Sequence, residues 1–175
     1  MSKEDMANKV PSEQFNLQIR TVADGISHRV KSPDKEVKKK IINRKIWAIS
    51  DGLNLYVNGY QIDFDRAYYK VEHEGKYLLF QGGMTSAEAG AVAFGGGLVG
   101  AAIASQSRWL YAWNPQKGDY YRLNKSNLET WLEDTPWLLS DYQMESRPKD
   151  MEVLIHYASM RNDAYDELKE EEKEE

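Results

Sequence analysis

The side chains that could carry acid–base or metal chemistry are scattered along this sequence. None of the histidines stands at the H-x-x-x-H or H-E-x-x-H spacing that would place two imidazoles on one helix face; they are His28, His73 and His156. The chain has no cysteine, which removes thiolate nucleophiles and thiolate metal ligands. It also has no G-x-S-x-G elbow and no P-loop. The sequence therefore predicts no catalytic residue, no metal site and no cofactor.

One group of acids would form a site if the fold brought it together. Asp63, Asp65 and Glu72 could form a carboxylate cluster if the strands that carry them are adjacent. Acids on the solvent face of a strand are common, and we favour that interpretation. His73, beside the Glu74-Gly75 turn, is interpreted as a hairpin-end residue. An enzyme is therefore only the third functional hypothesis.

A Gly/Ala-rich segment, residues 89–104, is the most unusual stretch of the chain. It carries no charge and has five glycines among its 16 residues. Within it, Gly95-x-Gly97-x-x-Gly100 fits the G-x-G-x-x-G pattern of dinucleotide-binding loops. A Rossmann unit needs a second parallel strand that ends in an acid about 20 residues later. The next expected strand, residues 109–113, ends at an asparagine, so its context argues against a nucleotide site.

Two interpretations of this segment remain. Gly and Ala let a backbone approach its neighbours closely, which favours a packing element inside the fold. Gly96-x-x-x-Gly100 also matches the small-xxx-small pattern of helices that touch in lipid. The segment is shorter than the roughly 20 apolar residues that a spanning helix needs. We favour packing and keep membrane contact or self-association through residues 89–104 as the alternative, with Phe94, Gly96 and Gly100 as its candidate contact residues.

Tyrosines on the expected strands offer another candidate surface. The chain has eleven tyrosines and five tryptophans. Tyr56, Tyr68 and Tyr120 would either form a recognition face for a ligand or pair across strands and stabilise the sheet. The sheet-stabilising interpretation is the favoured one, and the recognition face is the candidate site of a binding module.

The elements that position these residues are mostly strands joined by tight turns. Asp51-Gly52 predicts a two-residue type I′ hairpin, and Asn58-Gly59 and Glu74-Gly75 predict two more. The loop that begins Asn114-Pro115 joins a last pair of strands. The runs with strand character are residues 14–22, 26–30, 45–50, 53–58, 60–65, 67–73, 76–81, 108–113 and 119–123.

The C-terminal part is predicted to be helical. Ser126-x-x-Glu129 fits a capping box for a short helix that reaches residue 133. Thr135 and Pro136 fit the N-cap and first position of a second helix, which runs to about residue 145. A third helix, from about residue 149 to 168 or beyond, has an apolar stripe at helical spacing. The predicted fold class is α+β: an antiparallel, curved β-meander of about seven or eight strands, followed by helices packed on one face or end.

Length and charge set the organisation of the chain. We expect a disordered segment at residues 1–13, a single α+β domain at 14–168 and an acidic tail at 169–175. The net charge is −5, of which the last 13 residues carry −6, so the body is near neutral. This balance gives no support to nucleic-acid binding. The start is polar and no apolar leader follows it, so a native start would indicate a cytoplasmic protein.

A set of motifs carries a family resemblance. It comprises the hairpin segment at residues 47–60, with its Ser-Asp-Gly and Asn-Gly-Tyr motifs, Tyr68-Tyr69-Lys70-Val71, Gly75-Lys76-Tyr77-Leu78 and Leu132-x-x-x-Pro136-x-Leu138-Leu139-x-x-Tyr142. Over residues 40–160, with the internal Gly/Ala segment, the chain resembles a family of small uncharacterised bacterial cell-envelope proteins, secreted or periplasmic. Members of that family usually begin with a secretion leader, which this chain lacks.

The resemblance implies an envelope or periplasmic setting, and it implies no activity and no catalytic residue. The leading hypothesis is a non-catalytic binding or interaction module of the bacterial cell envelope. The identity of its ligand or partner is not predicted.

Overall fold

The computed structural model describes residues 14–34, 36–37, 39–85, 88, 90–92 and 108–174. The disorder predicted for residues 1–13 lies outside the described residues. So do the candidate contact residues Phe94, Gly96 and Gly100, and with them most of the Gly/Ala-rich segment.

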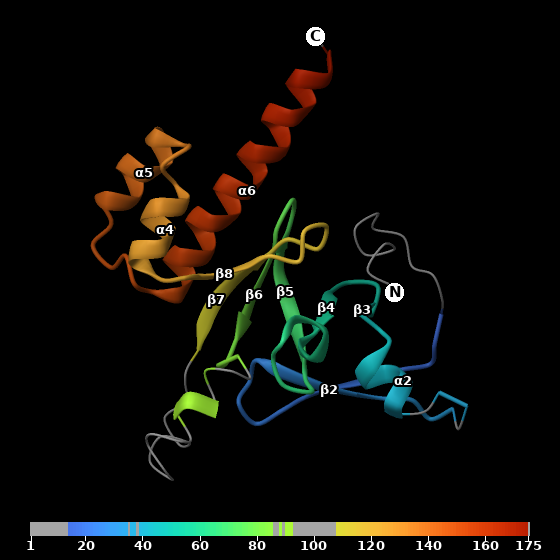
Figure 1. Ribbon diagram of the computed structural model, residues 1–175. Helices are drawn as coiled ribbons and strands as arrows, with labels where there is room; N and C mark the ends of the chain where they lie inside the picture. The colour runs from blue at the N-terminus through green and yellow to red at the C-terminus, as the bar shows by residue number, and fades with distance from the viewer. Residues whose placement is uncertain are drawn as a thin grey trace. The chain divides into compact units, whose positions relative to one another are not determined.

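In these ranges the chain has an α+β fold, with an eight-stranded antiparallel sheet that is not closed and helices mostly at its C-terminal end (Figure 1). The strand order is β1-β2-β5-β6-β7-β8, while β4 pairs with β5 and β3 with β4. The elements are β1 Gln18–Thr21, β2 Ser27–Lys31, α2 Lys39–Arg44, β3 Ala48–Ser50, β4 Leu55–Asn58, the 3-10 helix η1 Gly59–Ile62, β5 Tyr68–Glu74, β6 Leu78–Gly82, β7 Trp109–Trp113, β8 Tyr120–Leu123, α4 Lys125–Trp131, α5 Pro136–Gln143 and α6 Met151–Glu174.

The described residues divide into two compact units. The N-terminal unit takes those within Met1–Val71, Gln81–Arg108 and Pro115–Gly118. The C-terminal unit takes those within Glu72–Phe80, Trp109–Asn114 and Asp119–Glu175.

The N-terminal unit is built around a small apolar cluster and one buried asparagine. The cluster consists of Val30, Ile42, Ile46, Ile49, Tyr56 and Tyr68. Asn58 is only 1% exposed, and its Nδ2 donates to the carbonyl oxygen of Ile46 at 2.6 Å. Its Oδ1 accepts from the Tyr60 amide at 3.2 Å. One side chain therefore links the segment after α2 to the start of η1.

The C-terminal unit has a larger core between its strands and its three helices. Successive strand side chains alternate between faces, so Leu110, Ala112 and Leu123 share one face of the β7–β8 hairpin. These residues are fully buried against side chains of α4, α5 and α6. The buried helix residues are Leu128, Leu132, Leu138, Tyr142, Leu154, Tyr157 and Ala158.

Several local predictions are confirmed. β5, which ends at Glu74, and β6 are neighbouring strands joined by a turn that begins at Gly75, and β7 and β8 flank the loop that begins at Asn114. α5 starts at Pro136 after Thr135, and the last predicted helix is α6.

The two-residue hairpin predicted at Asp51-Gly52 is wrong. Ser50 pairs with Leu55, so four residues connect β3 to β4. The Asp51 carboxylate accepts from the backbone amides of Leu53 at 2.9 Å and Asn54 at 2.7 Å. These bonds close a wider loop, as aspartate side chains commonly do in turns. They also lower the pKa of Asp51 to about 2, the Leu53 bond most strongly.

The strand predicted at residues 60–65 is also wrong, because the chain there forms η1 instead. Asn58 caps this helix, and Asp63 ends it in the left-handed region at φ 64°. Helix α2 was not predicted from the sequence, and Ile42, which is 2% exposed, anchors it in the core. The capping box at Ser126 is wrong as well, because Asn124 is the N-cap of α4.

Candidate functional site

Two of the three predicted aromatic site residues are buried in the N-terminal unit. The Tyr56 hydroxyl donates to Asp51 Oδ2 at 3.1 Å, and its ring contacts His28 edge-on at 5.0 Å. Tyr68, 1% exposed, donates to the carbonyl oxygen of Ile42 at 2.6 Å. Burial raises the pKa of both hydroxyls. Tyr120, on β8 in the C-terminal unit, is 40% exposed.

The acids considered as a carboxylate cluster have separate positions. Asp63 terminates η1. Asp65 accepts from the Ala67 amide at 3.0 Å and the Tyr69 hydroxyl at 2.9 Å. Glu72 lies on the part of β5 that belongs to the C-terminal unit. Within the described ranges, no group of three or more histidines or acids is placed to hold a metal ion.

Each of the three histidines has a different neighbour within its own unit. His28 lies against Tyr56, His73 Nε2 is 2.7 Å from Asp163 Oδ1, and His156 contacts Tyr157 edge-on at 5.1 Å. Over the part of the chain that the structure covers, no helix has the length and apolar character needed to cross a membrane.

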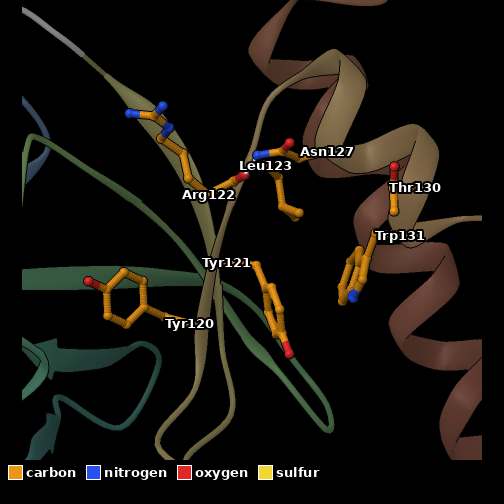
Figure 2. A pocket seen from close by; sticks show the side chains of 7 residues that line it. All are labelled: Tyr120, Tyr121, Arg122, Leu123, Asn127, Thr130 and Trp131. Carbon is orange, nitrogen blue, oxygen red and sulfur yellow. Dashed lines mark hydrogen bonds between the residues drawn. The ribbon is translucent and has the colours of Figure 1, made fainter.

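A pocket of about 460 Å³ opens between β8 and α4 in the C-terminal unit. It is lined by Tyr120, Tyr121, Arg122, Leu123, Asn127, Thr130 and Trp131. Figure 2 shows the Tyr121 side chain pointing toward Trp131 on α4, and Tyr120 and Arg122 pointing to the other side of the strand. On α4, spacings of three and four residues place Asn127, Thr130 and Trp131 on one helix face.

Asn127 joins the two elements that form the pocket. Its backbone amide donates to the side chain of the N-cap Asn124 at 2.9 Å. Its own Nδ2 donates to the carbonyl oxygen of Arg122 at 2.7 Å. The first turn of α4 is therefore tied to the strand that carries Tyr121, which fixes the spacing of the pocket walls.

The buried ring of Tyr77 lies beside both aromatic walls. Its centroid is 6.1 Å from that of Tyr121 and 5.2 Å from that of Trp131, with both pairs edge to face. Tyr77 is held in turn by Asn162 of α6, whose Oδ1 accepts from the Tyr77 amide at 3.0 Å and whose Nδ2 donates to the Tyr77 carbonyl at 2.7 Å. Burial raises the pKa of the Tyr77 hydroxyl.

A buried guanidinium supports Trp131. The Arg161 Cζ atom lies 4.2 Å from the Trp131 ring centroid, and Nε donates to the Trp131 carbonyl at 2.9 Å. Nη2 pairs with Asp134 at 2.6 Å, with the Arg161 side chain 8% exposed. Nη1 is buried and has no hydrogen-bond partner in the described chain. This arrangement fixes both the orientation of the indole and a positive charge against it.

The pocket combines ring faces with hydroxyl, amide and indole groups, which is the chemistry of ligand recognition. Of its lining residues, the sequence pointed only to Tyr120. The sequence signal that was missed is the short separation along the chain between the Tyr120-Tyr121 pair and a helix face that carries Asn127, Thr130 and Trp131. Only the β8–α4 connection places these groups around one space.

The sequence model of a family described as "Family of unknown function (DUF6563)" matches residues 1–165. No curated protein and no solved structure matches the chain.

Proposed function

The chain belongs to DUF6563, a family of unknown function, and we propose that it is a non-catalytic binding module whose ligand occupies the pocket between β8 and α4. The observation that carries the proposal is the convergence of two aromatic side chains from different elements. Tyr121 comes from the strand and Trp131 from the helix, and both contact Tyr77. A large aromatic side chain that stays 45% exposed, as Tyr121 does, keeps apolar area available for a partner.

Support also comes from the rigidity of the pocket walls. Trp131 is held by Arg161 through its ring face and its carbonyl, and Asn127 ties α4 to β8. A ligand that enters a preformed pocket loses less affinity to the ordering of side chains. The wall residues contribute ring faces and hydrogen-bonding groups, so the supported role is capture of a ligand.

The test uses saturation-transfer NMR on the full chain with oligosaccharide, short-peptide and aromatic-carboxylate probes. At least one probe class is expected to bind the parent protein. That signal should disappear in Tyr121→Ala and in Thr130→Trp, which fills the pocket from an exposed helix position. It should persist in Trp137→Ala and Tyr60→Ala, since these aromatics are 55% and 40% exposed and lie outside the pocket lining.

Circular dichroism and a thermal midpoint for each variant establish that it is folded. The proposal fails if no probe class binds, or if every bound probe binds Thr130→Trp as well as it binds the parent.

We also propose that this binding module acts in the bacterial cell envelope. The support is the resemblance carried by the Ser50-Asp51-Gly52 motif, the Tyr68-Tyr69 pair and the helical pattern from Leu132 to Tyr142. Fractionation of the native host followed by immunoblotting tests this setting. Recovery of the protein only in the cytoplasmic fraction would contradict it.

A further inference from the structure

We infer that the ligand of the β8–α4 pocket is a saccharide, neutral or acidic. This inference rests on the proposed function, because it names the ligand class of that same pocket. Three features of the pocket carry it: the aromatic faces, the polar groups beside them, and the charges around them.

The aromatic walls suit a ring with an apolar face. The face of an aromatic ring is electron-rich, and the C–H groups on one side of a sugar ring are weakly positive. Tyr121 and Trp131 enter the pocket from β8 and α4 (Figure 2). At about 460 Å³ the pocket lies at the small end of the roughly 300–1,000 Å³ range of small-molecule sites. It therefore has room for a compact ring-shaped ligand.

The polar groups of the wall suit hydroxyls. Thr130 contributes a hydroxyl that both donates and accepts, Asn127 an amide and Trp131 an indole N–H. A sugar hydroxyl also donates and accepts, so each of these groups has a matching partner on a saccharide. All three side chains sit on one face of α4, at fixed spacing beside the Tyr121 ring.

The charges argue against a cationic ligand. Aromatic cages often bind quaternary ammonium groups, but here the Arg161 guanidinium already lies 4.2 Å from the Trp131 ring centroid. Its buried Nη1 has no partner among the described residues. The pocket lining includes no acid, and its one arginine, Arg122, points its side chain to the other side of β8 (Figure 2). A cationic ligand would find the Trp131 ring already in contact with a guanidinium and no carboxylate in the lining to pair with, whereas a neutral sugar or a uronic acid needs neither.

The backbone argues against an added peptide strand. Peptides that extend a sheet bond to the main chain of its last strand, and β8 ends the strand order. The Arg122 carbonyl oxygen already accepts from Asn127 Nδ2 at 2.7 Å. A peptide strand at this position would have to displace the bond that joins α4 to β8, which favours a ligand held by side chains.

The experiment is a broad glycan array probed with the full chain, followed by calorimetric titration of the best oligosaccharide. The same titration also tests three alternative ligands: an acidic peptide, a trimethyllysine peptide and an aromatic carboxylate. We expect saccharide binding that weakens at least about tenfold in Tyr121→Ala and in Thr130→Trp. Trp137→Ala should bind as the parent does, because Trp137 is exposed on α5 away from the lining.

The outcomes separate the two proposals. If no glycan binds but a peptide or aromatic carboxylate binds in a Tyr121- and Thr130-dependent manner, the saccharide inference is overturned and the proposed binding function stands. If no probe of any class depends on the pocket, both are overturned. Since Thr130 is exposed, Thr130→Trp keeps the test decisive even if Tyr121→Ala unfolds.

Discussion

Asn162 is the residue on which the position of the Tyr77 ring depends most directly. It is fully buried, and its amide bonds both backbone groups of Tyr77, at 3.0 and 2.7 Å. Asn162→Ala leaves a buried N–H and a buried C=O without partners, so we expect a loss of about 2–4 kcal/mol in unfolding free energy. Urea unfolding measures it. Asp163→Ala is the matched control, because its pair with His73 is partly exposed and such pairs contribute about 0–1 kcal/mol. Equal losses in the two variants would contradict the assigned role.

Gly75 provides a second test of the same contact. A Cβ added at Gly75 would lie 2.6 Å from Asn162 Nδ2, closer than real Cβ atoms approach. We therefore expect Gly75→Ala to cost about 1–3 kcal/mol in the parent and clearly less in an Asn162→Ala background. A double-mutant cycle by urea unfolding gives the coupling energy. If the losses of unfolding free energy in the two single variants simply add in the double variant, the two residues are not in contact.

At the residue scale, the sequence identified aromatic candidates but not their exposure. Alternation on β8 predicts that Tyr120 and Tyr121 face opposite sides of the strand. It does not say which face a helix will border, and that decides which tyrosine lies beside Trp131. Tyr56 and Tyr68 are buried because α2, which the sequence did not predict, contributes Ile42 to their cluster, and Ile46 follows just after the helix.

At the element scale, the sequence pattern and the structure assign the N-cap of α4 to different residues. Asn124 Oδ1 accepts from the Asn127 amide at 2.9 Å, so Asn124 is the N-cap. Asn124→Ala should cost about 1 kcal/mol of unfolding free energy, whereas Ser126→Ala, at an exposed position inside the helix, should change it by less than about 0.5 kcal/mol. Guanidinium unfolding of both variants measures the difference. A larger loss of unfolding free energy in Ser126→Ala than in Asn124→Ala would show that Ser126 is the N-cap.

The elements that were predicted well have local causes. The turn at Glu74-Gly75 and the Thr135-Pro136 helix start each depend on the backbone preferences of two neighbouring residues. The failures at β3–β4 and η1 depend on side-chain bonds. The Asp51 carboxylate widens one loop, and the Asn58 amide caps a 3-10 helix where Asn-Gly favoured a hairpin. Such bonds form only when the geometry around them is already set.

At the scale of the whole molecule, the α+β class followed from the sequence because alternating runs precede runs with helical spacing. The strand order did not follow. β5 pairs with β2 and β4 as well as β6, and such partners are selected by packing over long sequence separations. The single domain predicted for residues 14–168 and the membrane or self-association role of residues 89–104 stay predictions.

Buried tyrosines in both units make the fold sensitive to alkaline pH. Burial is the largest cause of raised pKa values at Tyr56, Tyr68, Tyr77, Tyr142 and Tyr157. The pKa of Tyr142 and that of Tyr157 reach about 12, while an unfolded tyrosine ionises near about 10. The stabilisation from the protonated hydroxyls is therefore complete below about pH 10 and is lost as the pH rises toward 12.

We expect a spectrophotometric titration to resolve two groups among the eleven tyrosines. Tyrosines with solvent-exposed hydroxyls should ionise gradually. The buried group should ionise in a steeper step that coincides with loss of the circular dichroism signal, because their hydroxyls ionise readily only when the chain opens. Tyr142→Phe keeps the ring and removes one such hydroxyl, which donates to the Pro148 carbonyl at 2.6 Å. Between neutral pH and pH 12, the unfolding free energy of this variant should therefore fall by less than that of the parent protein. A single gradual titration with an unchanged dichroism signal would mean that water reaches these hydroxyls in the folded chain, and the cores assigned to the two units would then be wrong.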